Sequence, residues 1–148
     1  GIANAVWPGR VQKLDAGALT AIWPHQPIWL DGAHNAHGAT ALAATLHTIN
    51  DGKWNVICGA LNTRDPAEFL APLTQLSGRV ACLTIPDQDA SLSATEMSDV
   101  AKHLGLAASP ATTLEACFDL LDQTAPIIIC GSLYLAGHIL IQNKTLPV

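Results

Sequence analysis

The chain has 148 residues, of which 49% are hydrophobic and only 13% are charged. This length is that of one domain, and the composition is typical of a folded rather than a disordered protein. The 12 acidic and 7 basic residues give a net charge of −5, and no lysine or arginine cluster forms a nucleic-acid footprint. We therefore expect a single globular domain over residues 1–148 and no nucleic-acid partner.

Neither a membrane span nor a targeting segment is evident. No apolar run approaches the roughly 20 residues of a membrane-spanning helix, and no signal peptide is visible. The four cysteines form no C-x-x-C pair and lie in apolar surroundings: Cys58, Cys82, Cys117 and Cys130. We interpret them as small buried hydrophobic residues in a reducing compartment, with a disulfide or zinc site as the alternative. These features predict a cytoplasmic protein without membrane contact.

The first predicted elements are short. Residues 11–14 and 19–22 are candidate strands around a hairpin-like break at residues 15–17. Residues 27–30 form a short apolar run typical of a buried strand. After a tight turn at Gly32, apolar residues recur at helical spacing from 36 to 50, and Asn50-Asp51-Gly52 ends that helix.

The rest of the chain alternates strands with helices. Strands are predicted at residues 54–60, 80–85 and 126–130, and helices begin near residues 65, 93, 113 and 133. Helix-start patterns occur at 65–68 and 93–96, and Pro72 should kink or split its helix. Apolar strands alternating with amphipathic helices predict a mostly parallel, Rossmann-like α/β sheet with helices on both faces. Residues 11–22 would add an antiparallel edge strand or an N-terminal hairpin.

Polar residues and glycines follow several predicted strands, and we expect them to gather at one edge of the sheet. Asp31 and His34 follow one strand, Gly59 another, and Gly131 and Ser132 the last. Ligands of α/β proteins bind at this carboxyl edge. Asp31 either binds ribose hydroxyls or caps its own turn. His34 either orients a carboxylate or amine and moves a proton, or bonds to nearby backbone.

Three further interpretations also have structural alternatives. Arg10 follows a Trp-Pro-Gly turn and presents a guanidinium suited to phosphate, although an exposed arginine is often only solvated. Ser132 either forms an anion-binding turn or only caps the last helix. A metal site of Asp31, His34 and His37 is weakly supported, because no further ligand is evident. The sequence contains no P-loop, G-x-G-x-x-G or G-x-S-x-G motif.

Together these motifs resemble one family. The stretches W-P-G-R-V-Q at 7–12, L-D-G-A-H-N at 30–35, G-A-L with R-D-P between 59 and 66, and G-S-L-Y-L-A-G at 131–137 occur in the same order in the C-terminal domain of folylpolyglutamate synthase/dihydrofolate synthase. That enzyme belongs to the ATP-dependent Mur ligase superfamily, and the resemblance covers essentially the whole chain. The chain differs at Ala36, where proline is usual, in a longer stretch at 15–25, and at Arg64, where lysine is frequent.

The resemblance implies a reaction and a set of roles. ATP phosphorylates a pterin-bearing carboxylate, and the amine of L-glutamate attacks the acyl phosphate, so that folate or dihydropteroate gains a glutamate. Arg10 is then expected to bind ATP phosphates or ribose, and Asp31 the ribose. His34 and Ser132 would bind glutamate, with His34 as the catalytic residue. The P-loop and the Mg²⁺ ligands are expected in an N-terminal ATPase domain absent from these residues, so the chain alone is predicted to be an inactive monomer.

Three other functions remain open at this point. One is the matching domain of a cell-wall Mur ligase, and another is a free-standing flavodoxin-like ligand-binding module without chemistry. The third, a metal hydrolase that uses Asp31, His34 and His37, would require tightly bound zinc and is otherwise dismissed.

Overall fold

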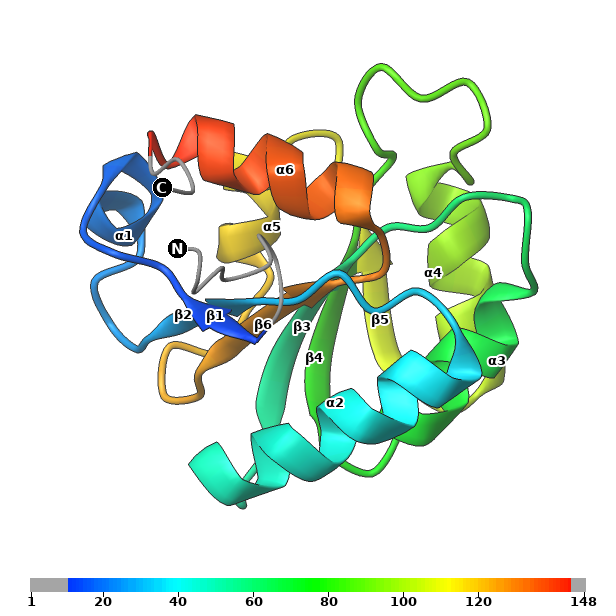
Figure 1. Cartoon of the computed structure of the whole chain (residues 1–148), viewed down its shortest axis with the longest axis horizontal. Coiled ribbons are helices and arrows are strands. Elements are labelled where there is room, and N and C mark those ends of the chain that lie inside the picture. The colour runs from blue at the N-terminus through cyan, green and yellow to red at the C-terminus, as the bar shows by residue number, and fades with distance from the viewer. Residues whose placement is uncertain (1–10, 145–148) are drawn as a thin grey trace, which may run out of the picture.

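One six-stranded sheet, in the order β1-β2-β6-β3-β4-β5, forms the centre of the computed structural model, which describes residues 11–144 (Figure 1). The strands are Gln12–Lys13 (β1), Ile28–Leu30 (β2), Trp54–Cys58 (β3), Ser77–Cys82 (β4), Ala107–Pro110 (β5) and Ile127–Cys130 (β6). Among the paired strands of residues 11–144, only β1 and β2 are antiparallel. The predicted α/β class, the mostly parallel sheet and the antiparallel edge strand are confirmed.

Helical segments connect the strands and cover both faces of the sheet. They are Ala18–Ile22 (α1), Ala36–Ile49 (α2), Pro66–Leu70 (α3), the 3₁₀ turn Ala71–Leu73 (η1), Ala94–His103 (α4), Leu114–Asp119 (α5) and Leu133–Gln142 (α6). In Figure 1, α6 lies above the strands and α2 lies below them. As predicted from Pro72, the helix that begins at Pro66 is split, because α3 ends at Leu70 and continues as a 3₁₀ turn.

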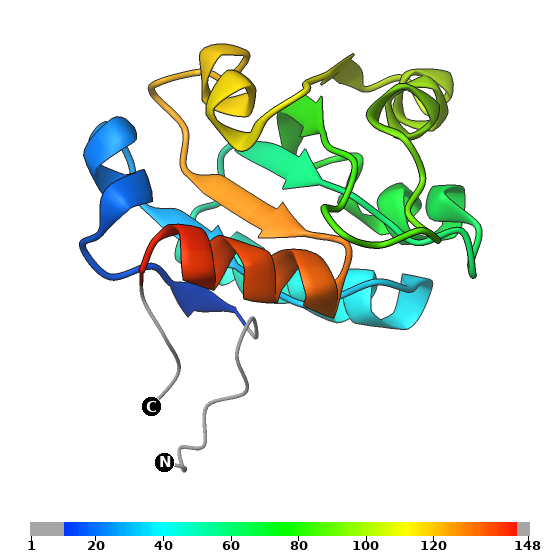
Figure 2. The same ribbon diagram turned by 90° about the horizontal axis from the view of Figure 1, so that it is seen from above.

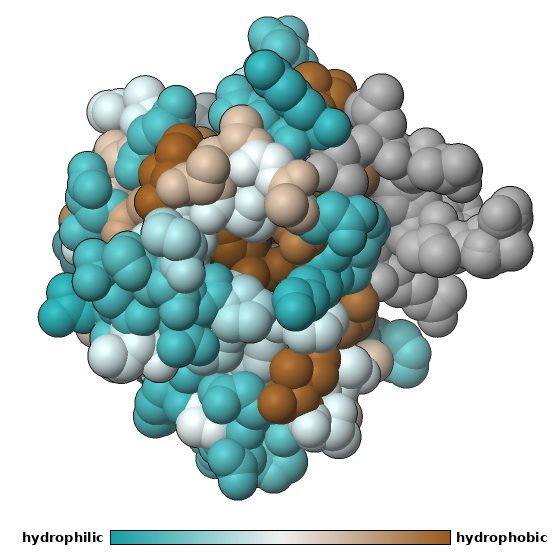
Figure 3. All heavy atoms as spheres, turned by 90° about the vertical axis from the view of Figure 1, so that its left-hand side faces the viewer, coloured by the Kyte–Doolittle hydropathy of each residue, from teal (hydrophilic) through white to brown (hydrophobic). Residues whose placement is uncertain are grey.

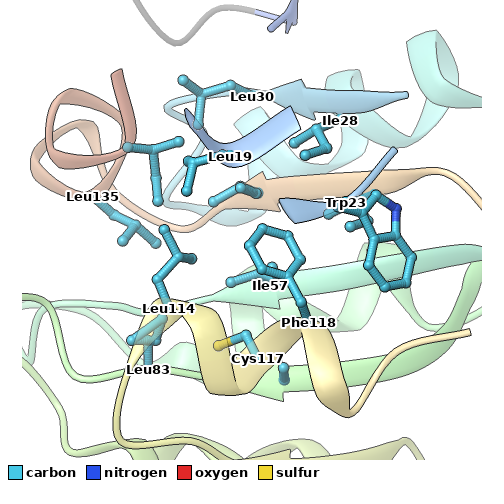
Figure 4. Packing of buried hydrophobic residues seen from close by; sticks show 14 of the residues in the cluster. Leu19, Trp23, Ile28, Leu30, Ile57, Leu83, Leu114, Cys117, Phe118 and Leu135 are labelled. Atoms are coloured by element: carbon cyan, nitrogen blue, oxygen red, sulfur yellow. The ribbon is translucent and has the colours of Figure 1, made fainter. Parts of the chain in front are cut away.

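Each face of the sheet has its own apolar core, because successive residues of a strand point to opposite faces. In β6, Ile127 and Ile129 belong to one core and Ile128 to the other. The first core packs against α1, α5 and α6. In it, the rings of Trp23 and Phe118 stack with their centroids 5.7 Å apart (Figure 4). The second core packs against α2, α3 and α4. This two-sided burial explains why the central strands are continuous apolar runs.

The predicted strand at residues 19–22 is wrong, because these residues form α1, so the predicted hairpin of residues 11–22 is not made. Within the start of this helix, the Gly17 N–H donates to Thr20 Oγ1 at 2.8 Å. Leu19 is buried, and its N–H donates to Asn143 Oδ1 at 2.8 Å, across 124 positions of sequence. The helix is therefore stabilised by a distant residue that the local pattern does not reveal.

Strand β5 was not predicted from the sequence. Its four residues, Ala-Ala-Ser-Pro, include none of the β-branched or aromatic side chains that favour strands. The strand pairs only with β4, at the edge of the sheet, where a proline is tolerated. The predicted strand at 80–85 is also shifted, because β4 begins at Ser77 and ends at Cys82.

All four cysteines are buried and free, as the sequence predicts. Cys58 and Cys82 lie on neighbouring strands with their sulfur atoms 3.9 Å apart. The hydrogen bond to Cys82 and burial raise the pKa of Cys58, and burial raises the pKa of Cys117 to about 12. Burial and the nearby Asp31 raise the pKa of Cys130. Cys58, Cys117 and Cys130 therefore stay protonated at neutral pH and act as small apolar groups.

The surface seen from the left of Figure 1 is mostly hydrophilic and contains a small apolar hollow (Figure 3). Within residues 11–144, no helix is both long enough and apolar enough to cross a membrane.

Truncating a core leucine of α2 should destabilise the fold. Leu46 has 0% of its surface exposed, so Leu46→Ala should lower the free energy of unfolding by about 2–5 kcal/mol, measured by urea denaturation. Ile141→Ala is the matched control, because its side chain is 66% exposed and should cost far less. Equal losses from the two substitutions would contradict the assignment of Leu46 to the core.

Candidate functional site

A pocket of about 170 Å³ lies at the carboxyl ends of β3 and β6, beside the turn that leads into α2. Three separate segments line it: His34 after β2, residues 60, 61, 63–66 and 69 after β3, and residues 131–134 after β6. Figure 2 shows the first turns of α2 and α6 at the same end of the strands, although the two helices cover opposite faces of the sheet. The predicted gathering of His34, Gly131 and Ser132 at one edge of the sheet is therefore confirmed.

Asp31 lies at this edge but does not line the pocket. Its carboxylate is largely buried, with 8% of the residue exposed. Oδ1 accepts a hydrogen bond from the Val11 N–H at 2.7 Å, and Oδ2 accepts one from the Ala33 N–H at 2.8 Å. The turn-capping interpretation is thus observed. Since a carboxylate oxygen can accept more than one hydrogen bond, the ribose contact stays a prediction.

His34 is exposed in the turn between β2 and α2, and a backbone contact fixes its tautomer. Its Nδ1 lies 3.0 Å from the carbonyl oxygen of Gly32. A carbonyl oxygen only accepts, so Nδ1 must carry the hydrogen. In the neutral ring, Nε2 is then left as a hydrogen-bond acceptor. The next residue, Asn35, caps α2 by accepting from the Gly38 N–H at 2.8 Å.

Ser132 caps α6 and also lines the pocket. Its Oγ accepts hydrogen bonds from the N–H groups of Tyr134 and Leu135, at 3.0 and 3.5 Å. The helix-cap interpretation is therefore observed. Neither bond uses the hydroxyl hydrogen, so Ser132 retains one donor for a ligand in the pocket that it lines.

Gly131 sets the path of the chain from β6 into α6. Its φ of +118° lies in a region that side-chain-bearing residues rarely adopt. A Cβ at this position would collide with the carbonyl oxygen of Gly59, at the end of the neighbouring strand β3. Glycine at 131 therefore permits the close backbone approach that brings the start of α6 over the pocket.

The structure adds two pocket residues to which the sequence analysis gave no role. Arg64 is exposed in the loop after β3 and forms no ion pair with any of residues 11–144. Tyr134 follows the Ser132 cap and is 58% exposed. Their positions in the sequence could have indicated this role, because both residues follow the carboxyl end of a parallel strand, where α/β proteins bind ligands.

The other proposed positions are not brought into this pocket. Arg10 lies outside the described residues, so the structure does not test its predicted contact with ATP. His37 is exposed and does not line the pocket. In the described part of the chain, no three His, Cys, Asp or Glu side chains lie close enough together to hold a metal ion.

The fold and the pocket define a doubly wound α/β domain with a candidate ligand site at the carboxyl edge of its sheet. The family described as "Dihydrofolate synthetase, C-terminal domain" matches residues 20–142. The chain belongs to this family.

Individual relatives agree with the family match. Folylpolyglutamate synthase of Lacticaseibacillus casei is 33% identical over 141 residues, which make up 94% of this chain and 30% of the relative. A crystal structure of bifunctional folylpolyglutamate synthase/dihydrofolate synthase from Yersinia pestis, complexed with AMPPNP and Mn ion, matches with a TM-score of 0.73 and 26% identity. The match covers 93% of this chain and 31% of that one. The chain thus spans less than a third of the length of these relatives.

A cell-wall enzyme matches over a shorter stretch. UDP-N-acetylmuramoyl-L-alanyl-D-glutamate–2,6-diaminopimelate ligase of Corynebacterium efficiens is 36% identical over 90 residues, covering 60% of this chain and 16% of the relative.

Two glycines of the same motif should respond oppositely to alanine. Gly131→Ala should destabilise the protein by about 1–3 kcal/mol or more, because it adds backbone strain and a collision. Gly137→Ala is the control, since its Cβ would meet open space within α6. It should stabilise the protein by about 0.5–1 kcal/mol. Urea unfolding of both variants tests the prediction, which fails if Gly131→Ala is neutral.

Proposed function

We propose that this chain is the C-terminal domain of an ATP-dependent ligase that adds L-glutamate to folate or dihydropteroate through an acyl phosphate. The observation that carries the proposal is that His34, Arg64 and Ser132, from three separate segments, line one pocket. Membership of the dihydrofolate synthetase family supports the same class of reaction.

The polarity of the pocket matches an amino acid that has two carboxylates. The neutral His34 ring offers an acceptor at Nε2 for the amine. The hydroxyl of Ser132 offers a donor for one carboxylate, and the Arg64 guanidinium offers a planar cation for the other. Thr63 and Asp65 also line the pocket, and the Asp65 carboxylate offers a second acceptor for the amine. Among these groups, the Arg64 cation favours glutamate over an amino acid with an uncharged side chain.

The proposed chemistry needs a neutral amine. His34 Nε2 takes a proton from the glutamate ammonium group as the general base. The freed amine attacks the carbonyl carbon of the acyl phosphate and the C–N bond forms. The C–O bond then breaks, and phosphate leaves with its electrons and with the second proton of the amine. The pocket walls hold the amine in place and exclude water, which would otherwise hydrolyse the acyl phosphate.

ATP and Mg²⁺ are proposed to bind mainly to an N-terminal P-loop ATPase domain that closes against this one. Since residues 11–144 assemble no metal-binding cluster, the Mg²⁺ ligands are proposed to come from that domain. Arg10 would contribute to ATP binding, and Asp31 would contact the ribose hydroxyls at the carboxyl edge of the sheet. The AMPPNP and Mn ion of the Yersinia structure support a nucleotide and a divalent cation. We propose a monomer in the cytoplasm, where free buried cysteines are usual.

The alternatives have less support. The cell-wall ligase matches 60% of the chain, whereas the dihydrofolate synthetase family matches residues 20–142. A binding module without chemistry would leave the polar set of His34, Arg64 and Ser132 unexplained.

The division into two domains can be tested by assay. The isolated chain should show no ATP-dependent incorporation of radiolabelled glutamate, because it has no P-loop of its own. The complete protein that joins this domain to a P-loop domain should incorporate glutamate into folate or dihydropteroate. Activity of the isolated chain would refute the division, and a preference for a muramyl-peptide acceptor would refute the proposed substrate.

His34 should affect catalysis without affecting the fold, because its side chain is exposed. In the complete ligase, His34→Ala should lower kcat/KM for glutamate by about a hundredfold or more, the usual effect of losing a general base. His37→Ala is the control, since His37 is also exposed but does not line the pocket. The base role is rejected if both variants keep full activity in steady-state assays.

A further inference from the structure

We propose that Asp31 is a positioning residue that fixes the tautomer of His34 through the peptide group between Gly32 and Ala33. This inference rests on the proposed function, in which His34 is the general base, and it gives Asp31 a role in the binding and activation of glutamate. The two side chains act on each other through one backbone group. A ribose contact of Asp31 would affect ATP instead, so the two roles can be separated by experiment.

The peptide group between Gly32 and Ala33 is hydrogen-bonded on both sides. Its N–H, which belongs to Ala33, donates to Asp31 Oδ2 at 2.8 Å. Its carbonyl oxygen, which belongs to Gly32, lies 3.0 Å from His34 Nδ1. The N–H and C=O of a trans peptide group lie in one plane and point in opposite directions. A carboxylate that holds the N–H therefore also fixes the direction in which the carbonyl group meets the imidazole ring.

The Asp31 carboxylate is itself held by contacts outside this turn. The backbone N–H of Asp31 donates to the carbonyl oxygen of Ile129 in β6 at 2.9 Å, and Oδ1 accepts from the Val11 N–H at 2.7 Å. Only 8% of the residue is exposed, and shielding from water strengthens such hydrogen bonds. At the other end of the turn, the carbonyl oxygen of Ala33 accepts from the Gly131 N–H at 2.9 Å. The turn is thus bound at both ends to β6 or to the residue that follows it.

The direction of the Gly32 carbonyl group decides which ring nitrogen of His34 carries the hydrogen. The peptide group that follows a glycine rotates easily, because glycine has no Cβ. If this peptide group turned over, it would present its N–H to Nδ1, and Nδ1 would have to accept. The hydrogen would then lie on Nε2, which could no longer take a proton from the glutamate ammonium group. Asp31 prevents this rotation, because a carboxylate only accepts and so requires the N–H on its own side.

The first experiment measures the tautomer of His34 in this chain. Two-bond ¹H–¹⁵N correlation spectra of histidine-labelled protein distinguish the two tautomers at mildly alkaline pH, where histidine rings are neutral. The His34 signals are assigned by their absence from the spectrum of His34→Ala. The wild type should show Nδ1–H, whereas Asp31→Ala should show a large share of Nε2–H. Ser93→Ala is the matched control, because Ser93 also accepts from a backbone N–H, at 3.1 Å, but caps α4 and does not line the pocket.

The second experiment measures kcat/KM for glutamate in the complete ligase at saturating ATP, where a weakened ribose contact is overcome by mass action. Asp31→Ala should lower this value about tenfold or more, since a small displacement of a reacting group can cost roughly a hundredfold. In a His34→Ala background the same substitution should cost less than about twofold, because residues that act as a unit are not additive. Asp31→Asn keeps an oxygen that can accept from the N–H two residues on, so it should retain both the tautomer and the activity. If Asp31→Ala is unfolded in urea titrations, Asp31→Leu replaces it, because leucine fills a similar volume without an acceptor.

Tautomer and activity should change together in every folded variant at position 31. The inference is overturned by a wild type in the Nε2–H form, or by a variant without an acceptor that keeps the Nδ1–H form. It is also overturned if activity falls while the tautomer is retained, or if the losses from Asp31→Ala and His34→Ala multiply in the double variant. A wild-type ligase that adds no glutamate, or a fully active His34→Ala, contradicts the proposed function instead. The spectra then still test the effect of Asp31 on the ring.

Discussion

The parallel pairing of β6 with both β2 and β3 is the constraint on which the candidate site depends. In this register Leu30 lies opposite Ile129, and Cys58 lies opposite Cys130. Strand β6 thus lies between β2 and β3, which come much earlier in the sequence. Because all three run in the same direction, their carboxyl ends coincide, and the residues that follow them line one pocket. Burial on both faces of the sheet stabilises this arrangement, since a shift of one residue would exchange the two apolar cores.

The residues at this edge fall into two groups with different physical roles. Asp31 and Ser132 are buried and accept hydrogen bonds from backbone N–H groups. Asp31 bonds Val11 before β1 and Ala33 in the turn after β2, and Ser132 bonds Tyr134 at the start of α6. The other group consists of exposed side chains that line the pocket: His34, Arg64 and Tyr134. The first group positions the backbone, and Ser132 also lines the pocket, whereas the second group provides acceptor, cation and aromatic surface for a ligand. Substitution in the first group therefore alters fold and site together, whereas substitution in the second alters the site alone.

Elements with strong local signals were predictable from the sequence. The Ser93–Glu96 capping box is observed, with both of its hydrogen bonds, at the start of α4. The β6 strand was predicted because its residues form an uninterrupted apolar run that a doubly covered sheet requires. Elements without strong local signals could not be predicted from the sequence. Helix α1 is five residues long and depends on Asn143, and β5 is a short edge strand stabilised by its pairing with β4. Tertiary contacts outweigh propensity in both cases.

By itself, the sequence determined the alternation of strands and helices, the likeness to one ligase family, and the placement of Asp31, His34 and Ser132 after strands. These features depend on local periodicity and on turn residues, which are readable along the chain. Only the tertiary structure decided that Arg64 and Tyr134 share a pocket with His34, and that Asp31 accepts a hydrogen bond from the N–H of Val11, 20 positions earlier. The physical reason is that the order of strands in a sheet is set by long-range pairing and by burial on both faces, which no local pattern encodes.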